Sequence, residues 1–283
     1  MGVGQTHGRH SSATGGNMHP LTTVDVPAAN VAIHWFEQST FALKDSGGTV
    51  VQIDPYYPRS RPAERYMHAD PPLDETQLPT DYILLTHAHS DHTCSQSIGR
   101  IRDAFPDVHV VGPEESIAQV LADTDVDEAH TRVIQAGESA TLGAMTAHAV
   151  YAKPPGGDPD ADIGPPDVTH LGYVVQAAGA SVYISGDPIN TFAEHDSLVV
   201  PVADLDPDIG FLTNHPTEGE FPFFEGSVAT ALGIGLTHVA PAHYQCFVTR
   251  NYDPDEWAAY FPAEGPAPVV VPHNSHIVYP SGL

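Results

Sequence analysis

The chain has 283 residues, enough for one large domain or two small ones with a substantial core. It carries 10 Lys and Arg against 36 Asp and Glu, a formal net charge of −26. Nucleic acids and anionic membranes are bound through basic patches, so this balance argues against both as partners. Scarce lysine and evenly spread acid indicate either a protein whose self-repulsion is screened by molar salt or an ordinary acidic cytosolic protein.

The first 20 residues are rich in Gly, Ser and His and lack an apolar stretch. They are not typical of a secretory signal, and no apolar run is long enough to span a bilayer, so we expect a cytoplasmic protein. We predict a disordered or tag-like arm at 1–30 and a single domain at 31–283. The two cysteines, Cys94 and Cys246, are either buried thiols or part of a site wall. Oligomeric state is left open, with a homo-oligomer as one option.

In the first half, apolar runs between turn residues predict strands, and amphipathic stretches with helix-start signals predict helices. The expected strands are 31–36, 40–43, 49–53, 82–85 and 108–111, and the expected helices are 93–104 and 113–122. The proline-rich residues 55–79 are expected to form an irregular loop.

The second half repeats this order. The expected strands are 132–134, 140–142, 145–151, 171–177, 181–185, 208–213, 237–240, 269–271 and 276–279, and the expected helices are 227–235 and 254–261. Strands that alternate with helices in both halves predict an α/β (α+β) fold of mixed sheets with helices on their outer faces. The loop at 154–167, rich in Pro, Gly and Asp, is either a lid or a solvated connector.

The segment Thr86–His92, Thr-His-Ala-His-Ser-Asp-His, follows an apolar strand and holds four residues that bind metals. A strand would direct His87 and His89 to one side, and a turn would bring Asp91 and His92 inward. One His pair and one Asp–His pair suit two adjacent divalent metals. Because the chain has 18 His, chance clustering of surface histidines is the alternative.

Three later residues, His148, Asp187 and His243, lie at or near the ends of predicted strands. Taken singly, Asp187 could cap a turn and the two histidines could be core residues. Taken together with Thr86–His92, the set favours ligands.

This order of residues resembles the metallo-β-lactamase superfamily. The segments Gly172–Val175, Tyr183–Asp187 and Pro241–Tyr244 resemble its branch of ascorbate-6-phosphate lactonase and related metal-dependent hydrolases. The resemblance extends over roughly residues 31–280 and implies a four-layer αββα sandwich.

The resemblance also implies two divalent metals, with Zn²⁺, Mn²⁺ and Fe²⁺ all compatible with imidazole and carboxylate ligands. One metal would be held by His87, His89 and His148, the other by Asp91, His92 and His243, with Asp187 as the bridge. Asp54 matches an early structural Asp of the superfamily and would orient a ligand by a hydrogen bond. His89 stands where oxygen-reducing di-iron relatives have Glu, which counts against a redox role.

The expected chemistry is hydrolysis by a metal-bridging hydroxide, with Asp91 and Asp187 as the catalytic carboxylates. The small-molecule substrate would be an ester, a lactone or a phosphoester; a phosphodiesterase and a non-catalytic metal-binding subunit are the alternatives. Candidate substrate contacts are His170, His215 and Tyr244. The arginines in 59–65 and Arg250 either meet an anionic substrate or balance local acid.

Overall fold

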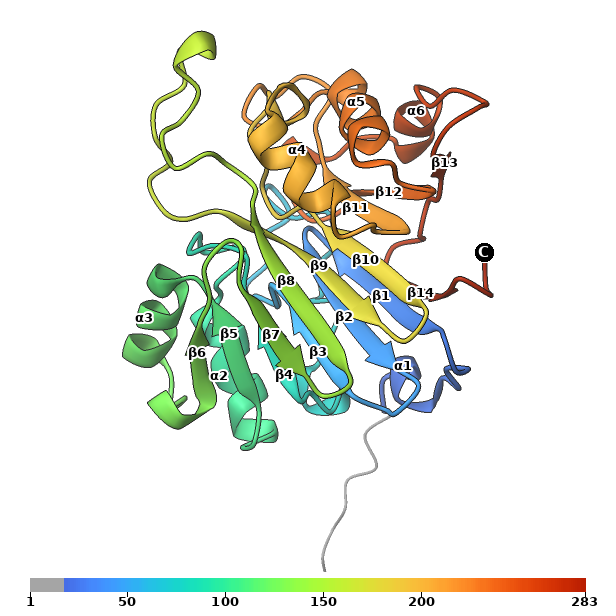
Figure 1. Ribbon diagram of the computed structural model, residues 1–283. Coiled ribbons are helices and arrows are strands. Elements are labelled where there is room, and N and C mark those ends of the chain that lie inside the picture. Colours follow the sequence, from blue (N-terminus) through green and yellow to red (C-terminus); the bar gives the residue numbers. More distant parts are fainter. Residues whose placement is uncertain (1–17) are drawn as a thin grey trace, which may run out of the picture.

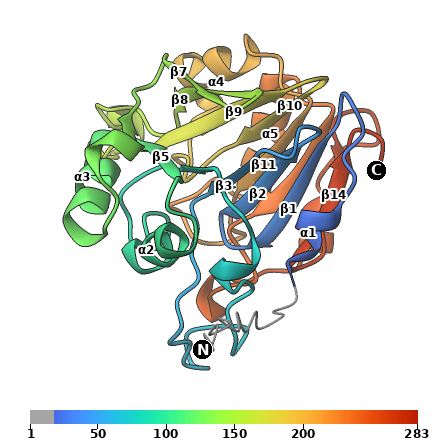
Figure 2. The same ribbon diagram turned by 90° about the horizontal axis from the view of Figure 1, so that it is seen from below.

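The computed structural model describes residues 18–283, which form two seven-stranded sheets packed face to face with helices on both outer sides (Figure 1). Figure 2 shows these layers in succession, with α4 on one side of the two sheets and α1 and α2 on the other, and Figure 1 shows α5 beside α4. The predicted four-layer αββα sandwich is therefore confirmed.

The first sheet has the strand order β14-β1-β2-β3-β4-β5-β6. Its strands are β1 (Val31–Glu37), β2 (Thr40–Asp45), β3 (Val50–Ile53), β4 (Tyr82–Leu84), β5 (His109–Gly112), β6 (Thr131–Val133) and β14 (Ser275–Tyr279). Pairing is antiparallel from β14 to β3 and parallel from β3 to β6. The first-half helices are α1 (Pro20–Thr23), α2 (Ser95–Ala104) and α3 (Glu114–Asp123).

The second sheet has the order β13-β12-β11-β10-β9-β8-β7. Its strands are β7 (Ser139–Leu142), β8 (Met145–Tyr151), β9 (Leu171–Ala177), β10 (Ala180–Ile184), β11 (Ile209–Thr213), β12 (His238–Ala242) and β13 (Ala267–Pro268). Pairing is antiparallel from β7 to β10 and parallel from β10 to β13. The second-half helices are α4 (Asp196–Ala203), α5 (Phe224–Ile234) and α6 (Pro254–Ala258).

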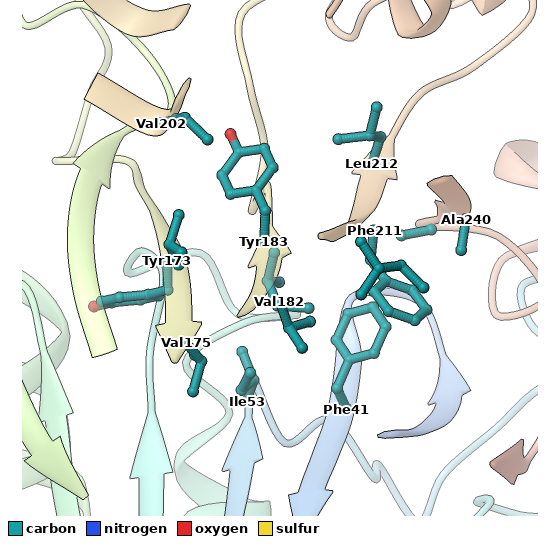
Figure 3. Close-up of a cluster of buried hydrophobic side chains, with 14 of the residues drawn as sticks. Phe41, Ile53, Tyr173, Val175, Val182, Tyr183, Val202, Phe211, Leu212 and Ala240 are labelled. Carbon is teal, nitrogen blue, oxygen red and sulfur yellow. The ribbon is translucent and has the colours of Figure 1, made fainter. Parts of the chain in front are cut away.

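The main core lies between the two sheets (Figure 3). Phe41 from β2 meets Phe211 from β11 at a ring-centroid distance of 5.0 Å, an edge-to-face pair across the interface. Ile53 and Val182 add to the same cluster. Such packing of inward-facing side chains, about 10 Å from sheet to sheet, holds the two halves of the chain in a fixed relation.

Several sequence predictions differ from the structure. Residues 18–30 are not a disordered arm, because α1 places the fully buried side chain of Leu21 in the core; residues 1–17 of that predicted arm lie outside the described part of the chain. Helix α4 was not predicted and contains Pro201, which ordinarily breaks the pattern of a helix. The expected strand at 269–271 is replaced by the two-residue β13.

Among residues 18–283, no helix is long and apolar enough to cross a membrane. The proline- and glycine-rich loop at 154–167 contains one short 3₁₀ turn, Pro159–Ala161. Asp158 fixes the loop, since its carboxylate lies 2.7 Å from the Thr191 hydroxyl and 2.9 Å from His195 Nε2.

Candidate metal centre

The site forms where strands of both sheets end. The segment His87–His92 follows β4, Asp187 follows β10 and His243 follows β12. These three strands belong to the parallel parts of their sheets, and the carboxyl ends of parallel strands meet at one edge. Loops from opposite halves of the chain thereby converge on one place.

His87, His89 and His170 form the first ligand group, with one ring nitrogen of each within 4.8 Å of the others. Leu171 N donates to Thr86 O at 2.9 Å, which places His170 beside the motif. His87 Nε2 lies 3.1 Å from His89 Nδ1, and the His87 and His170 rings stack at 4.1 Å. Three imidazoles thus face a common point.

Asp91, His92 and His243 form the second group, again with ligand atoms within 4.8 Å. Asp91 Oδ2 lies 3.9 Å from His92 Nε2 and 4.0 Å from His243 Nε2. The turn that brings His92 inward is closed by its backbone N–H, which donates to His89 O at 3.0 Å.

Asp187 stands between the two groups. Its carboxylate lies 3.7 Å from His87 Nε2, 3.3 Å from His92 Nε2 and 3.6 Å from His243 Nε2. Gly186 permits this placement, because its φ is +58° and a Cβ there would lie 2.4 Å from Leu171 O. One carboxylate therefore reaches members of both groups.

Asp54 fixes the orientation of His92 from behind. Asp54 Oδ1 accepts a hydrogen bond from Thr86 N at 2.8 Å, and Oδ2 accepts one from Thr86 Oγ1 at 2.5 Å and lies 2.8 Å from His92 Nδ1. If the proton of His92 is on Nδ1, where it is donated to Asp54, then Nε2 is unprotonated and its lone pair faces Asp187. Metal-ligating histidines are commonly held by such a carboxylate.

Burial and charge set the protonation of the cluster. Burial lowers the pKa of His87 far below its usual value and that of His170 to about 3, so both rings are neutral at pH 7. Burial opposes the charge on Asp187 and would raise its pKa, but the neighbouring His92 outweighs burial, so the pKa of Asp187 lies well below the usual value. Burial also opposes the charge on His92, but Asp187, Asp91 and Asp54 outweigh it and raise the pKa of His92 well above the usual value. A metal at His92 Nε2 would displace a proton from this ring, because imidazole binds metals in its neutral form.

The donor set fits divalent metals. His170 Nδ1 and Nε2, His92 Nε2 and Asp187 Oδ1 are buried and have no hydrogen-bond partner in the described part of the chain. Unpaired buried polar atoms are costly, and metals held by the two groups would pair His92 Nε2, Asp187 Oδ1 and one ring nitrogen of His170. Nitrogen and oxygen donors without thiolate are compatible with Zn²⁺, Mn²⁺ and Fe²⁺.

The structure corrects the place of His148. Its backbone pairs within the second sheet, its Nε2 lies 3.2 Å from Gln176 Oε1, and its side chain borders a separate cavity beside α4. Of the described residues, His170 rather than His148 completes the first group. The sequence predicted His170 only as a substrate contact, whereas the structure makes it a candidate metal ligand.

The other two expected substrate contacts are structural. His215 Nδ1 accepts hydrogen bonds from the backbone of Thr217 and Glu218, at 3.3 and 2.9 Å, and so closes a turn. Tyr244 is buried and stacks on Trp35 at a centroid distance of 4.6 Å. Cys94 and Cys246 are both buried free thiols.

A cavity of about 390 Å³ opens onto the cluster. Two arginines, Arg65 and Arg250, are in its wall together with His89, Asp91 and Asp187. Arg250 is paired with two acids, with Nε 3.3 Å from Glu218 and Nη2 3.1 Å from Glu220.

Arg65 has a different environment from Arg250. Its guanidinium lies over the rings of Tyr66 and Phe247, at 5.4 and 5.2 Å, and it has no acidic partner among residues 18–283. On the other side of the first ligand group, the exposed carboxylate of Asp167 lies 3.0 Å from His89 Nε2. The far end of the 154–167 loop therefore touches the metal centre.

The two-sheet sandwich with its His- and Asp-lined centre at the strand ends has the architecture of the metallo-β-lactamase fold. The chain belongs to the beta-lactamase superfamily, whose domain model matches residues 32–217. Relatives include a UPF0173 protein of Pyrococcus abyssi, 29% identical over 60% of this chain and 69% of its own length. A UPF0173 metal-dependent hydrolase of Halobacterium salinarum is 28% identical over 77% of this chain and 85% of its own length.

Solved structures share the fold. An isothiocyanate hydrolase from Delia radicum gut bacteria has a TM-score of 0.67 at 17% identity, over 87% of this chain and 98% of the other. The metallo hydrolase Igni18 of Ignicoccus hospitalis has a TM-score of 0.64 at 18% identity, over 88% of this chain and 98% of the other.

Proposed function

We propose that this chain is a dinuclear metal-dependent hydrolase that acts on an ester, lactone or phosphoester substrate with an anionic group. The position of Asp187 carries the proposal, because its carboxylate lies within 3.7 Å of ligand atoms in both groups. His87, His89 and His170 would hold one metal, and Asp91, His92 and His243 the other. Bound divalent metals supply Lewis acidity, which polarises a substrate oxygen and lowers the pKa of water.

The side chains divide the remaining work. Asp187 is buried, which opposes its charge, but the neighbouring histidines lower its pKa well below the usual value, so it would remain ionised and would be available as a ligand to metals held by either group. Asp91 is one-fifth exposed and lines the cavity, so its carboxylate is placed to accept a proton from an attacking water. No serine or cysteine nucleophile is needed in this scheme.

Arg65 supports the anionic character of the substrate. It is one of only 10 cations in the chain, and it stands at the cavity without an acidic partner in the described residues. A guanidinium in that setting can pair with a carboxylate or phosphate through parallel hydrogen bonds. Both a phosphoester and a lactone or ester with an anionic substituent offer such a group to Arg65.

The test combines metal analysis with hydrolysis of generic lactones and phosphodiesters, with added Mn²⁺ or Zn²⁺ in high salt. We expect two metals per chain and hydrolysis that is lost in His89→Ala. The control is His130→Ala, since the His130 ring pairs with Asp127 at 2.7 Å, away from the centre. Full activity of His89→Ala with metal bound would overturn the mechanism, and metal-loaded protein inactive on every substrate would favour a non-catalytic metal-binding subunit.

A further inference from the structure

Gln38, directly after β1, is fully buried against the segment that carries His243. Its backbone N–H donates to Tyr244 O at 3.0 Å, and its carbonyl accepts from His243 N and from Trp35 Nε1, both at 3.0 Å. Its φ is +54°, a conformation that is uncommon for residues other than glycine and asparagine and that is held by the surrounding structure. The side chain of Gln38 is therefore held in one direction.

That direction is toward the second ligand group. Gln38 Nε2 lies 2.7 Å from Asp91 Oδ2 and 2.7 Å from His243 Nε2. Gln38 Oε1 is buried and has no partner among the described residues. The carboxamide thus touches two of the three side chains that would hold the second metal.

A hydrogen bond at His243 Nε2 and a metal at His243 Nε2 exclude each other. An imidazole nitrogen either has one in-plane lone pair, which accepts one hydrogen or binds one metal, or carries a proton and binds no metal. The exclusion holds whichever of the two groups donates, so it does not depend on the tautomer of His243 or the orientation of the amide. In the first group, His87 Nε2 contacts His89 Nδ1 at 3.1 Å, but this contact joins two members of the group itself. Gln38, a residue outside both groups, has no hydrogen bond to the first group in the described residues.

We propose that Gln38 is a gate for the second metal position: its carboxamide must leave Asp91 and His243 before these residues and His92 can hold a divalent cation. This inference rests on the proposed function. It makes the Asp91–His92–His243 position the weaker of the two and the second to fill. The complete site then forms only when the free metal concentration exceeds the dissociation constant of the gated position.

The test measures metal binding itself. Protein stripped with a chelator is titrated with Co²⁺, followed by calorimetry and by the visible absorption of bound cobalt. In Gln38→Asn the amide is one methylene shorter and cannot reach both ligands, and Asn tolerates a positive φ well. Gln38→Leu retains most of the volume without hydrogen bonds. In both variants we expect the second dissociation constant to fall about tenfold, because hydrogen bonds to the ligands no longer compete, and the first to stay within about twofold.

The matched control is Gln245→Asn, the same change at another positive φ, +63°, where the side chain contacts His68 at 3.2 Å and no member of the metal centre. It should leave both constants unchanged. One ion in the wild type and two in Gln38→Asn would also support the gate. Two ions in both proteins, with the second constant unchanged or weaker in Gln38→Asn, would refute the gate alone. One ion or none in both would refute the dinuclear proposal and the gate with it.

Discussion

Replacement of His170 by alanine should remove a metal, whereas the same replacement at His148 should not. His170 is one of three imidazoles in the first group, and Asp187 supplies a fourth donor, 3.7 Å from His87 Nε2. A four-donor zinc site contributes about 10–16 kcal/mol, or roughly 3 kcal/mol for each donor. Loss of His170 should therefore weaken the first metal about a hundredfold.

His148 is a suitable control because it is a partly buried histidine of β8 in the same half of the chain, and its side chain lies away from the metal centre. Its only side-chain hydrogen bond in the described residues is the 3.2 Å contact with Gln176, so His148→Ala should cost about 1 kcal/mol of stability and leave the metal in place. The assay is metal content after dialysis against a graded chelator series. Equal retention of metal by the two variants, or greater loss from His148→Ala, would refute the assignment of His170.

Four further results are expected. Asp54→Ala should weaken the second metal about 10- to 100-fold by chelator competition, because His92 loses the carboxylate that orients it; unchanged affinity would contradict that role. Arg65→Ala should raise KM about tenfold for an anionic substrate and leave a neutral analogue unaffected; equal effects on both would argue against an anion contact. Burial lowers the pKa of His34 to about 3, whereas the ring in the unfolded chain titrates near 6.5. Because the unfolded chain then binds the proton more tightly, the free energy of unfolding falls as the pH falls below about 6.5. By pH 5 that loss should reach about 2 kcal/mol in denaturant unfolding and should be smaller in His34→Gln; an equal loss in the variant would exclude His34 as the cause. Finally, the melting temperature should rise between low and molar KCl, because salt screens the repulsion among the acidic side chains that give the net charge of −26. An unchanged melting temperature would contradict the hypothesis that molar salt stabilises the fold.

The fold and half of the site follow from the sequence because their signals are local. Thr86–His92 is one continuous segment behind an apolar strand, and the strand ends near Asp187 and His243 are legible from turn residues. The prediction of His148 as a metal ligand was wrong, although the alternation of side chains along the strand already indicates the direction of its ring. Met145, Ala147 and Ala149 are buried core residues of β8, so the intervening His148 faces the opposite side of the sheet.

Gln38 gave no such signal. Its contacts with Asp91 and His243 join positions 53 and 205 residues apart, and nothing in the neighbourhood of Gln38 in sequence indicates either partner. The left-handed backbone of Gln38, Asp54 and His243 could not be predicted from the sequence either, because positive φ is uncommon for every residue type other than glycine. These contacts and backbone conformations depend on how the two halves of the chain pack together, and local sequence patterns do not specify that packing.

The donors of the metal centre come from both sheets, and this division makes any bound metal a tie between them. His87–His92 belong to the first half of the chain, whereas His170, Asp187 and His243 belong to the second. Metal that binds only the native arrangement adds RT ln(1 + [M]/Kd) to the free energy of unfolding, about 2.7 kcal/mol at a hundredfold excess over Kd. Chelators would accordingly reduce hydrogen-exchange protection first at the strand ends where the two sheets meet. Depletion of metal would therefore increase the susceptibility of the protein to proteolysis as well as remove any metal-dependent activity.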